Sequence, residues 1–172
     1  MNTAMLSTLD RAREIAGTVT DPEMPMLTLL DLGVLREVYA ERDGAIVVTI
    51  TPTYSGCPAM ATMRDDLRMR LAAGGVDDVD VRTVLEPAWS SDWITPAGLR
   101  KLSQHGISPP SHVTVPPAGP VALTLTPPRQ QLHCPQCGST NTELTSAFGA
   151  TSCKSLHRCL DCREPFDHVK EI

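Results

Sequence analysis

The chain has 172 residues, of which 41% are apolar and 20% charged, and its net charge is −5; these values are typical of one or two globular domains. The negative charge argues against a nucleic-acid-binding face, and no apolar run approaches the length of a membrane span. No signal peptide is visible at the N-terminus. We therefore expect a cytoplasmic protein whose six cysteines bind metal or react as thiols rather than form disulfides.

The N-terminal part predicts an α+β fold, a small sheet covered by helices. Three segments repeat apolar side chains at helical spacing: residues 3–18, residues 58–73, and a segment that begins at Pro96 and ends before Gly106. Three short runs rich in β-branched residues predict strands: residues 37–40, 45–50 and 79–85. Asp43 and Gly44 separate the first two runs, which is a strong hairpin signal.

The loop from Thr51 to Pro58 joins the second predicted strand to the following helix. Pro58 suits the first turn of a helix, where its missing N–H costs nothing, and this places Cys57 at or beside the N-cap. There the helix dipole and the backbone N–H groups favour a thiolate. This position makes Cys57 a candidate nucleophile or ligand for a soft metal. The alternative is a small buried cysteine that only packs.

The chain changes character after residue 108. Seven prolines lie between Ser108 and Pro128, a density typical of a semi-rigid spacer. Within this stretch, residues 121–126 alternate in a way that could pair as an edge strand. We therefore expect a first domain over residues 1–108, a proline-rich linker over 109–130, and a small β domain over 131–172.

The last domain contains two Cys-x2-Cys pairs with 21 residues between them: Cys134 and Cys137, then Cys159 and Cys162. Four thiolates from two such turns predict a tetrahedral sulfur site, and zinc fits it best. A single iron of the rubredoxin type is the competing metal.

Three further residues near these pairs also carry chemistry. His133 and His157 are expected to be neighbours rather than ligands, because four cysteines already saturate the metal. Cys153 is left over, and the sequence leaves open whether it packs or is a reactive thiol at a loop tip.

The chain lacks the signatures of an independent oxygenase. No Glu-x-x-His pair offers ligands for a di-iron centre, and no glycine-rich fingerprint offers a flavin or nicotinamide site. A hydrolase would need Cys57 together with His105 or His112, and nothing in the sequence places a histidine near the loop. We therefore expect a protein that is not an enzyme.

The motifs together resemble a known family. In order, they are Asp21-Pro22-Glu23-x-Pro25, Asp31-Leu32-Gly33-Val34 and the loop from Thr51 to Cys57-Pro58. They resemble the SufT-like domain of iron–sulfur cluster assembly proteins over about residues 5–105. Residues 87–94 and the C-terminal cysteine pattern extend the resemblance to the PaaD (also called PaaJ) family, which is encoded with the multicomponent phenylacetyl-CoA epoxidase, and this match covers nearly the whole chain.

The resemblance implies an accessory role: assisting assembly of an iron–sulfur or iron centre in the epoxidase. The family's reactive cysteine falls on Cys57, with Asp21, Glu23, Thr51 and Thr53 around it, and Cys57 would carry an iron or iron–sulfur species transiently. The implied partners are the oxygenase and reductase components and iron–sulfur assembly proteins. We also expect a homodimer, because the small sheet leaves strand edges that need a partner, and the resemblance adds weight to this expectation. The alternative is a structural or regulatory subunit of the epoxidase without chemistry of its own.

Overall fold

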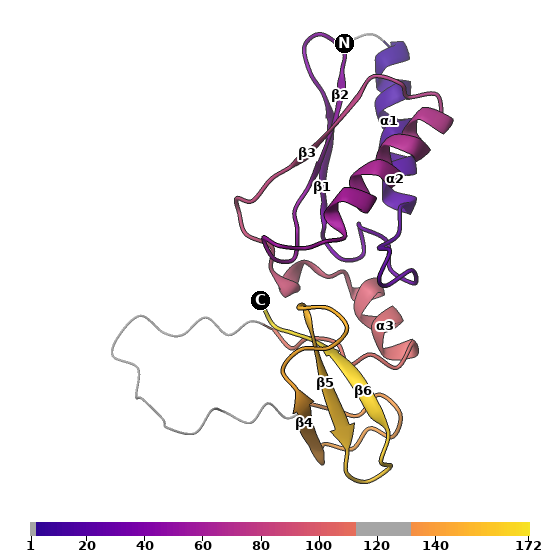
Figure 1. The fold of residues 1–172 in the computed structure, drawn as a ribbon. Helices are drawn as coiled ribbons and strands as arrows, with labels where there is room; N and C mark the ends of the chain where they lie inside the picture. The colour runs from indigo at the N-terminus through magenta and orange to yellow at the C-terminus, as the bar shows by residue number, and fades with distance from the viewer. Residues whose placement is uncertain (1–2, 113–131) are drawn as a thin grey trace, which may run out of the picture. The chain divides into compact units, whose positions relative to one another are not determined.

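The computed structural model describes residues 3–112 and 132–172, and its contacts divide the chain into two compact units, Met1–Lys101 and Leu102–Ile172. Figure 1 shows a helix-and-sheet unit at the N-terminus and a strand-rich unit at the C-terminus. The α+β class predicted from the sequence, with a small β domain at the C-terminal end, is confirmed. Among the helices of the described residues, none combines the length and the apolar character needed to cross a membrane.

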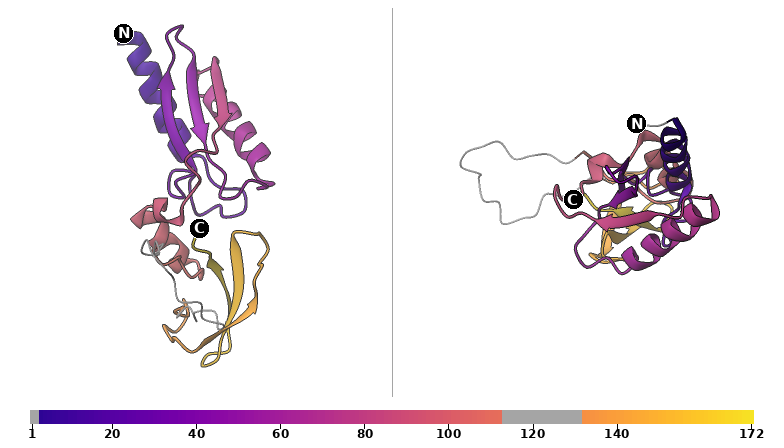
Figure 2. Two further views of the ribbon diagram at one scale, coloured as in Figure 1. Left: turned by 90° about the vertical axis from the view of Figure 1, so that its left-hand side faces the viewer. Right: turned by 90° about the horizontal axis from the view of Figure 1, so that it is seen from above.

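The first unit contains one three-stranded sheet with both long helices on the same face (Figures 1 and 2). Its elements are α1 (Thr3–Thr18), β1 (Leu35–Ala40), β2 (Ile46–Ile50), α2 (Met60–Ala73) and β3 (Val79–Thr83). The strand order is β1-β2-β3. The first pair is antiparallel and forms the predicted hairpin, and the second is parallel because α2 crosses between its strands.

One face of the sheet packs against the two helices. Val38, Val48 and Val81 pair in register across the three strands and are all buried. Side chains from α1 and α2 fill the space above them; those that are buried are Leu9, Ala12, Ala16, Met63, Leu67 and Leu71. On the other face, Arg82 bonds to Asp80 at 2.6 Å and to Glu41 at 2.8 Å. In β3 the buried Val81 lies between the exposed Asp80 and Arg82, as a period of two predicts, whereas every residue of the central strand β2 is buried.

Strand directions bring three loops to one end of the sheet. Leu35, at the start of β1, pairs with Ile50, at the end of β2, and Ile50 pairs with Thr83, at the end of β3. The segments that precede β1, follow β2 and follow β3 therefore all lie at this end (Figure 1). They contain the first motif with Asp21, the Cys57 loop and both tryptophans.

The segment before β1 is held by buried polar contacts. Gly33 has a φ of 68°, and a Cβ there would lie 2.6 Å from the Cβ of Trp93, so only glycine fits. Trp89 is buried and donates its indole N–H to the carbonyl of Leu32 at 2.9 Å. The tryptophans thus fix the loop that leads into β1.

Asp31 is the centre of a network of hydrogen bonds in this segment. Its carboxylate accepts hydrogen bonds from the Lys101 ammonium at 2.6 Å, the Thr28 N–H at 3.0 Å and the Thr95 hydroxyl at 3.3 Å. Burial alone would raise the pKa of Asp31 above 3.8, but the hydrogen bonds from Lys101 and Thr28 outweigh it and lower the pKa. The ionised form is therefore the one that folding stabilises.

We expect Asp31→Asn to lower the free energy of unfolding by about 1–2 kcal/mol at neutral pH, because it removes charge-assisted hydrogen bonds that are only partly exposed to water. Since folding depresses the pKa, this stabilisation is present above pH 3.8 and is lost as the pH falls through the folded value. Urea unfolding from neutral pH to about pH 3 measures the difference between variant and parent. Asp65→Asn, in the exposed pair with Arg68, is the matched control. A difference that is constant with pH would contradict the assignment.

A short 3-10 helix, η1 (Ser91–Trp93), and α3 (Pro96–Gln104) follow. Thr95 caps α3, because its hydroxyl accepts a hydrogen bond from the N–H of Gly98 at 3.0 Å. The division between the two units falls within this helix, after Lys101. A helix that starts at Pro96 was predicted from the same cap and proline.

The second unit is an antiparallel ribbon of β4 (Thr142–Ser146), β5 (Lys154–Cys159) and β6 (Pro165–Val169), in the order β4-β5-β6. It also includes the end of α3 and the following residues. The N–H of Ser108 donates to the carbonyl of Asp167 at 2.8 Å, and the carbonyl of Ser108 accepts from the N–H of Val169 at 3.1 Å. Ser108 thus ties residues 102–112, here called the strap, to β6.

This strap shifts the division of the chain relative to the expected ranges. The sequence placed residues 102–108 in the first domain, whereas their contacts group them with the ribbon. Pairing with β6, some 60 residues away, is not visible in local sequence. The predicted edge strand at 121–126 and nearly all of the predicted linker lie outside the described residues.

Candidate metal centre and thiol loop

Two tight turns carry the four predicted ligands. In the first, the carbonyl of Cys134 accepts a hydrogen bond from the N–H of Gly138 at 2.8 Å, and Gly138 has a φ of 75°. In the second, Cys159 ends β5 and Cys162 lies in the turn before β6. The N–H of Cys159 donates to the carbonyl of Glu164 at 2.9 Å, which closes this turn.

The ribbon brings the four sulfur atoms together. The Sγ atoms of Cys134, Cys137, Cys159 and Cys162 all lie within 4.8 Å of one another. Cys134 and Cys162 are 3.7 Å apart, and Cys137 and Cys159 are 3.6 Å apart. A zinc–sulfur distance of about 2.3 Å requires sulfur–sulfur edges of about 3.8 Å in a tetrahedron. The predicted grouping is confirmed, and the spacing fits a four-sulfur metal site.

The backbone prepares one of these thiols to lose its proton. Hydrogen bonding from the backbone of Cys162 is the largest cause that lowers the pKa of Cys159, to about 7. A thiolate is the form that binds metal. The same turn therefore orients the ligand and favours its charged state.

A polar link that the sequence did not reveal joins the two turns. Asp161 accepts hydrogen bonds from the Ser139 hydroxyl and from the Asn141 amide, the latter at 2.8 Å. These bonds, that from Ser139 first, lower the pKa of Asp161. Ser139 and Asn141 follow the first cysteine pair and Asp161 lies inside the second, so the link fixes the distance between them.

The structure also places the three other candidate residues of this unit. His133 is exposed, and His157 bonds through Nε2 to the Ser155 hydroxyl at 3.0 Å, so neither belongs to the sulfur cluster. Burial lowers the pKa of His157, with the nearby His168 adding to the effect. Cys153 is buried, with its sulfur 3.0 Å from the Thr151 hydroxyl. It packs, and the alternative of an exposed thiol at a loop tip is wrong.

Cys57 lies at the loop end of the sheet and is half-buried. Its N–H donates to the carbonyl of Tyr54 at 3.1 Å, and its carbonyl accepts from the N–H of Met60 at 3.4 Å. The helix begins at Met60, with Ala59 as N-cap, so the predicted N-cap position of Cys57 is wrong. Two consecutive turns occupy residues 54–60, and the thiol therefore lies before the first helical turn, where the dipole acts less strongly.

Thr51 starts this loop in a buried position. Its N–H donates to the carbonyl of Val34 at 2.9 Å, which joins the Cys57 loop to the segment before β1. Its hydroxyl is buried and has no hydrogen-bond partner among the described residues. Thr53 is half-buried two residues further on. An unpaired buried hydroxyl is unusual and costs free energy.

Asp21 and Glu23 differ in their surroundings. Asp21 is buried, and its carboxylate accepts the N–H groups of Glu23 at 2.7 Å and Met24 at 2.8 Å. These bonds hold a turn between Pro22 and Pro25. Glu23 is exposed. Participation of either carboxylate in chemistry at Cys57 stays a prediction.

Comparisons with known proteins match both parts of the chain. A family model described as "Iron-sulfur cluster assembly protein" matches residues 10–85, and one described as "PaaD zinc beta ribbon domain" matches residues 118–170. A crystal structure of a domain of unknown function, DUF59, from Bacillus anthracis is similar in fold, with a TM-score of 0.52 at 24% identity; it covers 58% of this chain and 94% of its own.

The matches to two relatives cover most of the length of each relative. An Fe-S protein maturation auxiliary factor of Porphyromonas gingivalis (strain ATCC BAA-308 / W83) is 33% identical and covers 59% of this chain and 97% of its own. A protein of Escherichia coli (strain K12), whose name gives it provisionally as one of the subunits of 1,2-phenylacetyl-CoA epoxidase, is 42% identical over 90% of this chain and 87% of its own. The chain therefore belongs to the PaaD family, in which an iron–sulfur cluster assembly domain is joined to a zinc β-ribbon.

Proposed function

We propose that this protein is an accessory factor of the multicomponent phenylacetyl-CoA epoxidase and assists assembly of an iron–sulfur or iron centre in one of its components. The names of its relatives support both halves of this proposal. The observation that carries it is the distribution of the six cysteines. Four form the sulfur cluster of the ribbon and Cys153 is buried, whereas Cys57 is partly exposed on a loop of the assembly domain.

In this proposal Cys57 handles cargo and does not turn over substrate. Its thiol loses a proton and binds iron or a cluster delivered by iron–sulfur assembly proteins in the cytoplasm. Exchange with the ligand side chains of the client then releases the cargo, so no electron transfer by this chain is required. The ribbon holds zinc through Cys134, Cys137, Cys159 and Cys162, where the metal supplies folding free energy and no reactivity.

The test is to express the epoxidase with and without this chain and to count iron and sulfide in each purified component. We expect one component to lack iron or sulfide when the chain is absent, and to regain it when the chain is supplied. Full metal content in every component without this chain would contradict the proposal.

The second candidate function is a structural or regulatory subunit of the epoxidase. It is favoured by the large apolar side chains that the ribbon exposes, since Leu144 is 59% exposed and Phe148 is 65% exposed. Stoichiometry separates the two functions. A structural subunit stays in the active complex at a fixed ratio, whereas an assembly factor is dispensable once the centre is built.

We also propose that the first unit forms a homodimer. Its three-stranded sheet leaves β1 and β3 as edges, and edges of this kind favour pairing with another strand. The expected mass by light scattering at micromolar concentration is twice 18.6 kDa. Arg82→Glu places a third acidic group beside Asp80 and Glu41 on the face opposite the helices. This variant should be a monomer if the two copies pair through that face, and should stay a dimer if they pair through a strand edge. A monomer mass for the parent would contradict the proposal.

A further inference from the structure

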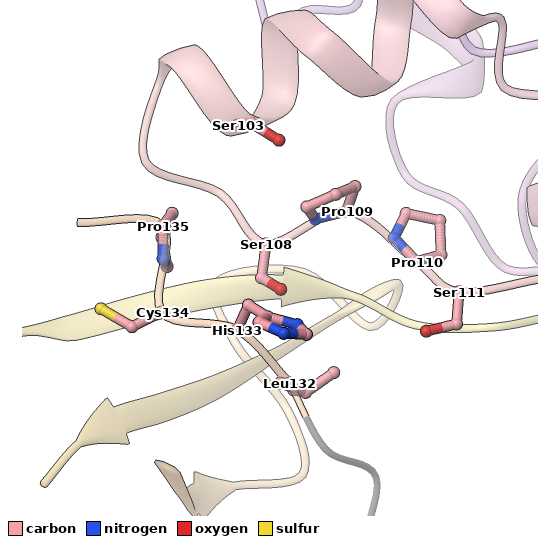
Figure 3. Close-up of a pocket in the computed structure, with 9 residues that line it drawn as sticks. All are labelled: Ser103, Ser108, Pro109, Pro110, Ser111, Leu132, His133, Cys134 and Pro135. Atoms are coloured by element: carbon pink, nitrogen blue, oxygen red, sulfur yellow. The ribbon is translucent and has the colours of Figure 1, made fainter. Parts of the chain in front are cut away.

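A pocket of about 290 Å³ lies within the second unit, between the strap and the first cysteine turn (Figure 3). One wall comes from the strap and the other from residues 132–135. The residues that line it are Ser103, Ser108, Pro109, Pro110, Ser111, Leu132, His133, Cys134 and Pro135. The role proposed for Cys57 does not use this pocket. Cys134 lines the pocket and also belongs to the sulfur cluster, but Figure 3 shows its sulfur turned away from the strap residues.

Both walls of the pocket are fixed before any ligand arrives. Ser108 is hydrogen-bonded on both sides of its peptide to β6, and its carbonyl is also 3.2 Å from Nδ1 of His168. The N–H of Ser111 donates to the Glu171 carboxylate at 2.9 Å. Gly106 approaches Gln136 so closely that a Cβ would lie 3.1 Å from its amide nitrogen. A preformed pocket of this kind binds with a small loss of conformational entropy.

The lining selects the chemistry of the occupant. Three proline rings and Leu132 supply flat apolar surface, and Figure 3 shows Pro109 and Pro110 across the opening from Leu132 and His133. Three serine hydroxyls and one imidazole supply hydrogen-bonding groups. None of the nine lining residues is Asp, Glu, Lys or Arg. A phosphate or carboxylate would therefore enter without a charged partner, whereas an uncharged ring with a hydroxyl matches both kinds of surface.

We propose that this pocket is a docking site for a tyrosine side chain of a partner protein. Its volume is slightly below the range of pockets for whole small molecules, so it accommodates a single side chain as an anchor within a wider contact. Buried aromatic anchors in rigid pockets dominate the energetics of many protein interfaces. Tyrosine satisfies the apolar and the hydroxyl surfaces together, which phenylalanine and leucine do not.

The test titrates N-acetyl-tyrosine amide into the ¹⁵N-labelled full chain with zinc bound. We expect chemical-shift changes confined to residues 103–111 and 132–135, with a Kd on the order of 1 mM for so small a probe. N-acetyl-phenylalanine amide, which lacks the hydroxyl, should bind at least about threefold more weakly if hydroxyl hydrogen bonds contribute. Phenylacetate, an aromatic anion, should bind more weakly still because the lining carries no charged side chain.

Ser103→Phe fills the opening from an exposed position on α3 and should weaken binding about tenfold or more. Thr145→Phe places the same ring on the exposed side of β4 and should leave binding unchanged. Ser111→Ala keeps the backbone bond to Glu171 and should reduce the preference for tyrosine over phenylalanine. This variant is the alternative test if the Ser103 variant misfolds.

Three outcomes would overturn the proposal. The first is an absence of shifts in the full chain, including the case in which another part of this chain already fills the pocket. The second is equal binding by the Ser103→Phe variant. The third is binding of p-cresol without binding of the amide, which would assign the pocket to a small phenol instead of a protein side chain. None of these readouts depends on Cys57, so failure here leaves the proposed function standing.

Discussion

Cells in which Cys57 is replaced by alanine should lose epoxidase activity, and the client component should accumulate short of iron or sulfide. The reason is chemical: the variant keeps the loop but has no soft ligand to accept the cargo. The substitution removes one half-buried sulfur, so we expect at most about 1–2 kcal/mol of lost stability. Activity in cells, metal content of the client and the unfolding midpoint of the variant are the measurements.

Cys57→Ser sharpens this test, because serine nearly keeps the shape and removes only the affinity for soft metals. It should fail as alanine does. Cys153→Ala is the matched control, since it removes a buried thiol that lies outside the sulfur cluster, and it should support full activity. Complete activity and metal content with the serine variant would assign Cys57 to packing and remove the loop from the chemistry.

Removing zinc, or replacing Cys134 with serine, should unfold the ribbon. One of its buried apolar clusters is made of Phe166 and the ligands Cys134 and Cys159, so that part of the core depends on the metal site. Structural zinc sites of this kind contribute on the order of 10 kcal/mol, far more than so small a core supplies. Elemental analysis should find about one zinc per chain in the parent. Amide resonances of residues 132–172 should collapse in the variant.

The first unit should keep its fold in the same experiment, because its core uses none of the four ligands. Resonances of residues 7–95 should therefore remain dispersed. If the resonances of both units lose their dispersion together, the two units do not fold independently. About one iron per chain in the aerobically purified parent, with the red colour of sulfur-ligated iron, would overturn the assignment to zinc.

What the sequence predicted well was local. The two cysteine pairs, the hairpin around Asp43 and Gly44, and the helix after Thr95 each depend on residues within a few positions of one another. Residue spacing determines their geometry, and the structure confirms all three. The grouping of two distant cysteine pairs could be predicted as well, because a metal needs four ligands whatever the length of the hairpin between them.

What it missed or misplaced depends on contacts over longer distances or on competing turns. Asp31 and Lys101 are 70 residues apart, and Ser139 and Asp161 are 22 apart, so no local pattern reveals these pairs. The predicted start of α2 was wrong for another reason. Pro58 is compatible with a first helical turn, but the chain closes two turns around Cys57 before the helix begins. Proline permits a helix start and does not determine one.

The strap determines which segment of this protein can be exchanged with the corresponding segment of a relative. Because Ser108 in the strap pairs with β6, the ribbon unit does not begin at its first cysteine. A chimaera that grafts only residues 132–172 onto a relative would keep the pairing of β5 with β6 but would remove the two backbone hydrogen bonds between Ser108 and β6, together with one wall of the pocket. Exchange of ribbons between relatives should therefore succeed only when the graft starts at Leu102 or earlier, inside α3 and ahead of the boundary that the cysteine spacing suggests.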